Sequence, residues 1–334
     1  ATNTKMRGGG AYFLISRSLG VEFGAAIGIV FYLAQAIAVA MYVIGFTEAF
    51  RATFSCFADS SPILIASTVN LVVFICVFIG AGWTIKIQYG ILAVLVAALA
   101  SFFLGAFGSA SPSQLGANLQ ASYPEGVGFF TAFALFFPAV TGIMVGISMS
   151  GSLRSPRKDI PVGTMSAIGV TLLIYLALIY WLSRIASPEE LLSNTTLMVE
   201  KAFWGWAILA GMLGATFSSA LGSLVAAPRV MQALASYKII PFSDFFSKES
   251  EDGEPRQAMF FAGAVGFIAL LAALAGGGLD AVAAIITMFF LITYAMLNVV
   301  VLIKQTLDTI SFRPTFSVSR IVPFIGVLGC TFVM

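Results

Sequence analysis

The sequence predicts an all-α membrane protein that crosses the bilayer many times. Three observations indicate this. Hydrophobic residues make up 59% of the 334 residues, charged residues make up only 10%, and the mean hydropathy is +1.00. Soluble domains usually carry about 25% charged residues. A water-soluble fold of this size could not cover so much apolar surface, so the bilayer is the natural solvent for the chain.

Nine apolar runs are candidates for spanning helices, each of which needs roughly 20 mostly apolar residues. In chain order they are residues 23–47, 63–82, 88–107, 128–150, 161–183, 205–234, 258–276, 279–303 and 321–334, the last one incomplete. The chain begins at Ala1 without an initiator methionine and ends at Met334 inside an apolar run. We therefore expect residues 1–334 to be a partial transmembrane transporter domain, truncated at both ends.

Lysine and arginine residues segregate between alternate loops when the N-terminal segment is placed in the cytoplasm. Of the 17 basic residues, only Arg51, Arg184 and Lys201 then fall on the outer side. The cytoplasmic set is Lys5, Arg7, Arg17, Lys86, Arg154, Arg157, Lys158, Arg229, Lys238, Lys248, Arg256, Lys304, Arg313 and Arg320. Cytoplasmic loops of membrane proteins carry this excess. We expect a multi-pass integral protein of the plasma (cytoplasmic) membrane whose chain starts on the cytoplasmic side.

Several function classes are excluded by what the sequence lacks. It has no histidine, and its three cysteines, Cys56, Cys76 and Cys330, show no metal-type spacing. We find no paired carboxylates, no nucleophile with a base, and no phosphate-binding glycine loop, so an enzyme is not expected. There is no basic cluster for nucleic acid. We expect no cofactor. The expected partners are membrane lipid and inorganic ions, and a homodimer is compatible with the sequence.

The fourth run contains the first candidate site. Pro138 deletes a helical hydrogen bond and disfavours helix at the residue before it, and Gly142 and Gly146 loosen the helix further. A helix broken at mid-membrane frees carbonyl groups for a cation and N–H groups for an anion. The alternative is a plain proline kink.

The second candidate site lies in the sixth run. Ala215, Ser218 and Ser219 fall at positions i, i+3 and i+4 and share one helix face. Two hydroxyls and a backbone carbonyl are hard oxygen ligands suited to a small cation. The alternative is that these serines allow close helix packing or bond back to their own helix.

The third candidate is a pair of tyrosines inside apolar runs, Tyr42 and Tyr294. A phenol in hydrocarbon needs a partner for its hydroxyl group. That group can give a lone pair to a cation or a proton to an anion. The alternative is a hydrogen bond to a carbonyl of a neighbouring helix.

Several segments resemble the cation-chloride cotransporters, in their sodium-potassium-chloride branch, within the amino acid-polyamine-organocation superfamily. They are residues 7–20 (RGGGAYFLISRSLG), 40–46 (AMYVIGF), 136–142 (FFPAVTG), 151–153 (GSL), 160–164 (IPVGT), 218–221 (SSAL), 227–228 (AP), Asn298 and 312–314 (FRP). The resemblance covers nearly the whole chain. It implies a LeuT-like inverted-repeat core, with this chain running from span three to span eleven and with residues 7–20 as the loop between spans two and three.

The resemblance also implies roles for individual residues. The sodium site would be formed by Ala215, through its carbonyl, with Ser218 and Ser219. The potassium site would be formed by Tyr42, Pro138, through its carbonyl, and Thr141. Chloride would be bound by the backbone N–H groups of Gly142, Ile143 and Met144 and by the hydroxyl of Tyr294. Potassium-only members of the family lack the serine pair, and the sodium-chloride branch has histidine where this chain has Tyr42.

We therefore expect a secondary active symporter that couples sodium to the transport of potassium and chloride. A sodium-coupled amino-acid permease of the same superfamily and a non-transporting regulatory relative stay open as alternatives. One departure from the family is the outer loop of residues 184–204, which is short and has no cysteine. The mixed-charge residues 248–256 are expected to be a solvated connector rather than a ligand site.

Overall fold

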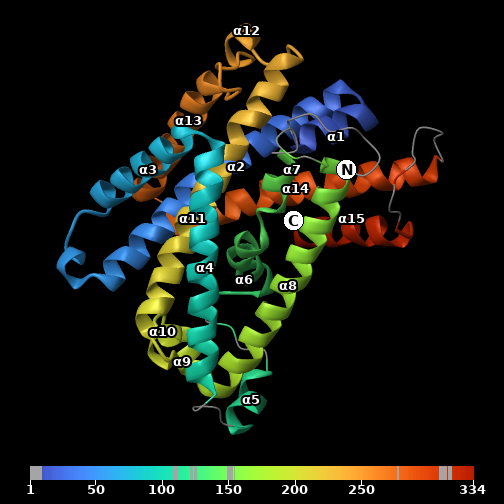
Figure 1. Cartoon of the computed structure of the whole chain (residues 1–334). Coiled ribbons are helices and arrows are strands. Elements are labelled where there is room, and N and C mark those ends of the chain that lie inside the picture. The colour runs from blue at the N-terminus through green and yellow to red at the C-terminus, as the bar shows by residue number, and fades with distance from the viewer. Residues whose placement is uncertain are drawn as a thin grey trace.

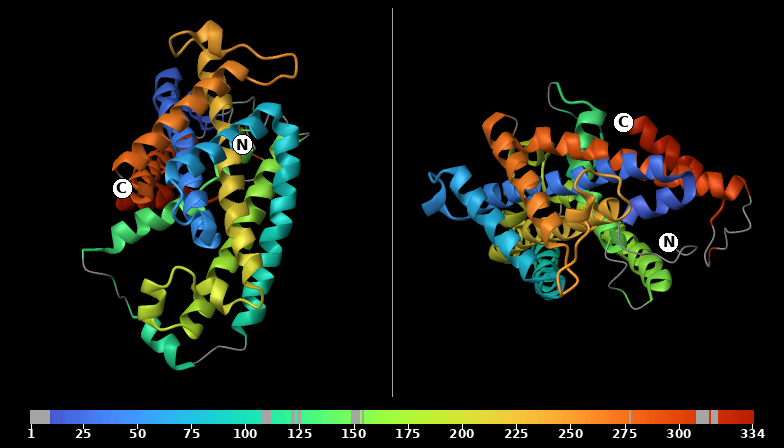
Figure 2. Two further views of the ribbon diagram at one scale, coloured as in Figure 1. Left: turned by 90° about the vertical axis from the view of Figure 1, so that its left-hand side faces the viewer. Right: turned by 90° about the horizontal axis from the view of Figure 1, so that it is seen from above.

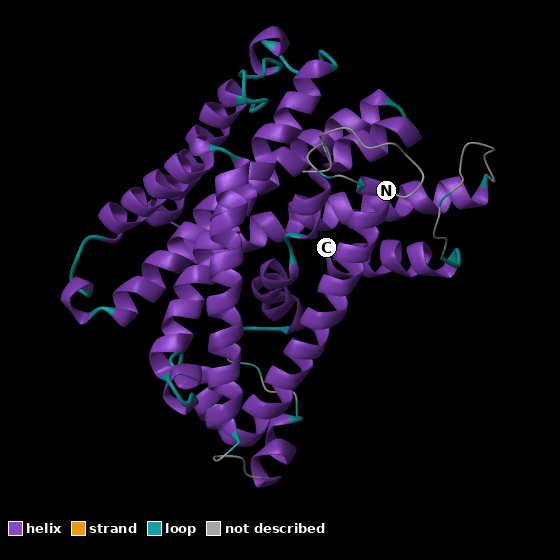
Figure 3. Ribbon diagram, in the orientation of Figure 1, coloured by secondary structure: helices purple, strands orange, loops and turns teal. Residues whose placement is uncertain are grey.

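The structure is a computed structural model that describes residues 10–107, 112–120, 123, 126–148, 153, 155–276, 278–307, 314 and 318–334. All regular secondary structure in these residues is helical (Figure 3). Parts of the quoted motifs, residues 7–9, 151–152 and 312–313, lie outside the described residues, as do Lys5 and Arg154. The predicted all-α class is confirmed.

Within the described residues, seven helices are long and apolar enough to cross a membrane. They are α2 (Val21–Thr53), α3 (Pro62–Ile79), α4 (Ala81–Ala106), α8 (Pro156–Ile185), α11 (Gly205–Ser236), α13 (Arg256–Gly276) and α14 (Gly278–Thr306). The other two predicted spans are shorter. One is α15 (Ile321–Val333), and the other is divided into α6 (Phe129–Phe136), the 3-10 turn η2 (Phe137–Val140) and α7 (Ile143–Ser148). Every predicted run therefore coincides with a helical segment (Figure 1).

Short elements occupy the connections. They are α1 (Gly10–Leu19), η1 (Ser55–Phe57), α5 (Pro112–Asn118), α9 (Pro188–Ser193), α10 (Leu197–Lys201) and α12 (Ser243–Phe246). The segment predicted as a loop before the first run is thus largely the helix α1. In Figure 1, α12 lies at one end of the molecule, and α5, α9 and α10 lie at the other. These connections were predicted to face opposite sides of the membrane.

Helix α2 is the centre of the bundle. It contacts α11, α14, α1, α13 and α3, and 72% of its most apolar window is buried, whereas none of the corresponding window of α8 is. A helix that is apolar all round is expected either in a protein core or against lipid, and the two helices represent these two cases. Two views place α14 and α15 side by side on one flank (Figure 2).

Helices α4 and α11 pack closely over much of their length. A Cβ atom added at Gly211 of α11 would lie 2.7 Å from the Cβ atom of Ala98 on α4, closer than real contacts allow. Small residues permit this approach of two helix backbones in membranes. The consequence for the site is that side chains of α4 reach the backbone of α11.

The prediction that residues 248–256 form only a solvated connector is wrong for Glu254. A carboxylate oxygen of Glu254 lies 3.1 Å from Nη2 of Arg229, and the two side chains are only 15% and 13% exposed. Glu254 also accepts a hydrogen bond of 3.1 Å from the backbone N–H of Ala81, the first residue of α4. The connector therefore ties the start of α4 to α11. Lys86, assigned to a loop, lies inside α4.

Candidate functional site

The fourth predicted span is interrupted at the residues that the sequence singled out. Helix α6 ends at Phe136, a 3-10 turn carries Pro138, and Thr141 has an extended backbone with φ −87° and ψ −177°. Gly142 follows with φ +99°, a conformation that L residues rarely adopt. Helix α7 then begins at Ile143. The segment is therefore a broken helix, and the alternative of a plain proline kink does not describe it.

Three oxygen atoms meet at this break. The hydroxyl of Thr141 donates a hydrogen bond of 2.7 Å to the carbonyl of Pro138. Because that hydroxyl already uses its proton, the Tyr42 hydroxyl is the donor in the 3.5 Å contact between Tyr42 Oη and Thr141 Oγ1. This contact is long for a hydrogen bond between oxygens. The structure thus brings together Tyr42 from α2 with Pro138 and Thr141, two segments about a hundred residues apart.

The beginning of α7 presents free backbone donors. In the described part of the chain, the N–H groups of Gly142, Ile143 and Met144 have no hydrogen-bond acceptor. The first N–H groups of any α-helix lack an intrahelical partner. Met144 is buried, while Gly142 is half-buried and Ile143 is exposed. Gly142 and Ile143 line a cavity of about 480 Å³ between the break and α8.

Tyr294 of α14 lies beside the same break. Its ring packs against Phe137 with 6.2 Å between centroids and 61° between the ring planes, and against Phe290 at 5.9 Å. Its hydroxyl oxygen is buried and has no hydrogen-bond partner among the described residues. A buried hydroxyl without a partner is unfavourable in a protein interior. For Tyr294, the alternative of a hydrogen bond to a carbonyl of a neighbouring helix is not realised within the described residues.

The three residues of the second candidate site lie on α11, and all are half-buried. Their neighbour Thr216 bonds back to the carbonyls of Met212 and Leu213, at 2.9 and 3.1 Å. Among the described residues, the hydroxyls of Ser218 and Ser219 donate to no protein acceptor. Back-bonding to their own helix, one of the two alternatives, therefore does not account for them, and close helix packing stays an alternative.

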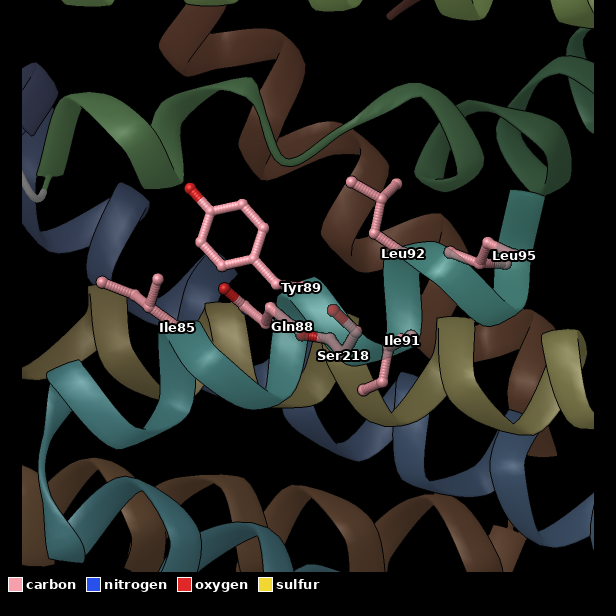
Figure 4. A pocket seen from close by; sticks show the side chains of 7 residues that line it. All are labelled: Ile85, Gln88, Tyr89, Ile91, Leu92, Leu95 and Ser218. Atoms are coloured by element: carbon pink, nitrogen blue, oxygen red, sulfur yellow. Dashed lines mark hydrogen bonds between the residues drawn. The ribbon is translucent and has the colours of Figure 1, made fainter. Parts of the chain in front are cut away.

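Ser218 faces a cavity of about 400 Å³ that α4 lines from the other side. Gln88 of α4 points across it, and its Nε2 atom lies 3.4 Å from the carbonyl oxygen of Ser218 (Figure 4). The sequence analysis missed Gln88. An amide within the third apolar run was the available signal, because polar groups inside spanning helices are costly and rare.

Tyr175 of α8 was also missed. Its hydroxyl donates a hydrogen bond of 3.0 Å to the carbonyl of Ala139, inside the break. The sequence analysis considered Tyr42 and Tyr294 as tyrosines in apolar runs, and the same criterion selects Tyr175.

The two candidate sites belong to one region of the bundle. The ring of Phe217 on α11 lies 6.2 Å from that of Phe46 on α2. A Cβ atom added at Gly222 would lie 3.8 Å from the side chain of Val145 on α7. Helix α11 is therefore in contact with the helix that carries Tyr42 and with the second half of the broken helix.

The polar groups gathered here are neutral. They are hydroxyls, carbonyls, an amide and backbone N–H groups, and in the described part of the chain no group of three His, Cys, Asp or Glu residues could hold a metal ion. Neutral oxygens replace the hydration shell of an alkali cation, as carbonyls do in ion filters. Free N–H groups and a phenol donate to an anion. The arrangement suits reversible binding of monovalent ions.

Comparisons with known proteins identify relatives along the whole chain. The sequence profile of the amino acid permease family matches residues 1–334. Solute carrier family 12 member 1 of Mus musculus is 33% identical over 391 residues, which cover all of this chain and 35% of that protein. Solute carrier family 12 member 2 of Squalus acanthias is 33% identical over 393 residues, which cover all of this chain and 32% of that protein. The chain spans about a third of the length of these relatives.

Proposed function

Since this chain belongs to the amino acid permease family, we propose that it is the core of a sodium-driven symporter for potassium and chloride, of the cation-chloride cotransporter kind. Its solute carrier relatives and its apolar helices support an integral membrane transporter. Permeases move solutes and carry out no covalent step. The ion identities come from the sequence resemblance together with the donor sets of the two candidate sites.

Sodium is proposed to bind at Ser218, Ser219 and the carbonyl of Ala215. Two hydroxyls that make no other bond among the described residues support this assignment, since they can turn toward a cation. Hard oxygen ligands suit small cations. Ser218 lines the cavity between α4 and α11, which supports a route for sodium to the site.

Potassium is proposed to bind at Tyr42, Thr141 and the carbonyl of Pro138. The single observation that carries the proposed function is the meeting of these three oxygens at a broken helix. The long contact between Tyr42 and Thr141 is weak, so a cation that coordinates both oxygens costs little in lost hydrogen bonding.

Chloride is proposed to bind at the N–H groups of Gly142, Ile143 and Met144, with Tyr294 as a fourth donor. The unpartnered phenol beside the break supports this role. Discontinuous helices in transporters hold substrates near the bilayer midplane, and rocking of one helix bundle against the other gives access from each side. Inward sodium flow would drive the other two ions.

Ion omission tests the proposed function directly. In the full-length protein, rubidium influx, with rubidium standing for potassium, is expected to require sodium and chloride together. Replacing Ser218 and Ser219 by alanine is expected to abolish sodium-dependent influx, because both hydroxyl ligands are lost. Thr216→Ala on the same helix is the control, since Thr216 bonds back to α11. Unchanged sodium dependence in the double variant would remove the sodium site.

An amino-acid permease is the second candidate, favoured by the family profile. It is distinguished in the same cells by uptake of labelled amino acids. Sodium-dependent amino-acid uptake that does not need chloride would select that function over ion symport. The proposed location is the plasma membrane, with the segment before α1 in the cytoplasm.

A further inference from the structure

Helix α8 faces outward, and none of its most apolar window is buried in the protein. Tyr175 on this helix is half-buried and directs its hydroxyl inward, where it donates to the carbonyl of Ala139 at 3.0 Å. The ring of Tyr175 also meets that of Phe136 edge to face at 5.7 Å. This side chain therefore contacts both the end of α6 and the 3-10 turn that follows it.

Ala139 lies between Pro138 and Thr141, whose oxygens form the proposed potassium site. The interrupted helix leaves carbonyl groups without their usual partners, and an unsatisfied carbonyl at membrane depth costs several kcal/mol. The hydroxyl of Tyr175 donates a hydrogen bond to one of these carbonyls, that of Ala139. Both polar groups therefore have a hydrogen-bond partner.

A ring contact and a hydrogen bond from Tyr175 both join α8 to the break. The cavity of about 480 Å³ separates residues 139–143 from Ala167, Ile168, Thr171 and Leu172 of α8. Tyr175 lines the same cavity and bridges it with its hydrogen bond. The hydrogen bond sets the direction of the Ala139 carbonyl beside this cavity, while the ring of the same tyrosine packs against Phe136.

We infer that Tyr175 is a positioning residue for the potassium site. It orients the Pro138 carbonyl and the Thr141 hydroxyl by holding the Ala139 carbonyl between them, and it links α8 to the broken helix. This inference rests on the proposed function, because it takes those two oxygens as potassium ligands.

Tyr175→Phe tests the inference, since it removes one oxygen and keeps the ring contact with Phe136. In the full-length protein, the rubidium concentration for half-maximal influx is expected to rise roughly three- to tenfold, the effect of one hydrogen bond. The sodium and chloride concentrations for half-maximal influx are expected to change less than about twofold. A purely structural role would lower the maximal rate or shift all three ions together.

Tyr180→Phe is the matched control. Tyr180 is exposed on the same helix, and its hydroxyl accepts from Arg184 at 2.8 Å, away from the break. Potassium-dependent thermal stabilisation of the purified protein gives a second readout that does not depend on delivery to the cell surface. Tyr175→Phe is expected to weaken the thermal stabilisation by potassium and to leave the thermal stabilisation by sodium unchanged.

An unchanged half-maximal rubidium concentration in active Tyr175→Phe protein, or an equal shift for all three ions, would overturn the inference and leave the proposed function standing. A wild-type protein whose influx does not depend on sodium and chloride would overturn both.

Discussion

Hydroxyl groups inside the apolar helices of this protein differ in the hydrogen-bond partners that they find. Thr47, Thr216 and Thr293 donate to carbonyls one turn earlier in their own helices. Ser218 and Ser219 do not, and the buried hydroxyl of Tyr294 has no partner among the described residues. Back-bonding is the usual fate of such groups in a membrane helix. Ser218, Ser219 and Tyr294 lie on α11 or beside the broken helix, which is why we propose them as ion ligands, whereas Tyr32 on α2 is unpartnered away from the break.

Tyr294→Phe is expected to raise the chloride concentration for half-maximal rubidium influx roughly tenfold, because it removes one donor to a charged ligand. Sodium dependence is expected to stay unchanged. Chloride titration of rubidium influx in the full-length protein measures both effects.

Tyr32→Phe provides the control for this prediction. Tyr32 of α2 is also buried with an unpartnered hydroxyl, but it stacks on Phe261 of α13 and not on the break. No change in chloride dependence for Tyr294→Phe, or an equal change for Tyr32→Phe, would remove the chloride role of Tyr294.

The decisive element is the broken helix, and its geometry depends on a glycine. Gly142 has φ +99°, and a Cβ atom added there would meet nothing within 4 Å. Substitution would thus strain the backbone without a steric clash with neighbours. The neighbouring Gly146 lies inside α7 with helical geometry and equally open surroundings.

Gly142→Ala is expected to lower the free energy of unfolding by about 1 kcal/mol, because an alanine is held in left-handed backbone space. Gly146→Ala is expected to be neutral or stabilising by up to about 1 kcal/mol, since alanine favours helix. Thermal unfolding of the purified full-length protein compares the two. Equal behaviour of both variants would show that the left-handed conformation at residue 142 is not required.

At the scale of the molecule, connections predicted to face opposite sides of the membrane lie at opposite ends of the bundle (Figure 1). The connector that follows α12 contains Glu249, Glu251, Asp252 and Glu254. Glu254 joins this connector to α11 and α4. At the other end, the capping box of Ser187 and Glu190 starts α9. Because the two sets of connections lie at opposite ends, a reagent that reaches only one side of the membrane can test the orientation of the chain.

Cys56 is exposed in η1, which the charge distribution places outside the cell. A membrane-impermeant thiol reagent is expected to label Cys56 in intact cells, and Cys56→Ala should lose that labelling. Glu251 is exposed in the connector after α12. Glu251→Cys, combined with Cys56→Ala, should react only after permeabilisation. The reverse pattern would invert the proposed orientation.

The fold class and the positions of the nine predicted spans followed from the sequence by itself, which also offered an interruption at Pro138 with a plain kink as the alternative. Apolar length and helix-breaking residues act locally, because the backbone must satisfy its own hydrogen bonds wherever lipid surrounds it. The grouping of Tyr42, Pro138 and Thr141 was available only through the family resemblance, and the structure brings the three residues together.

Only the tertiary structure revealed Tyr175 on the Ala139 carbonyl, Gln88 on the Ser218 carbonyl and Glu254 between α11 and α4. Each of these contacts joins a side chain to a backbone group or charge on another helix. Such contacts depend on the rotation of each helix about its own axis, because this rotation determines which residues face a neighbouring helix. In a chain this uniformly apolar, hydrophobic periodicity says little about that rotation, and packing between helices sets it.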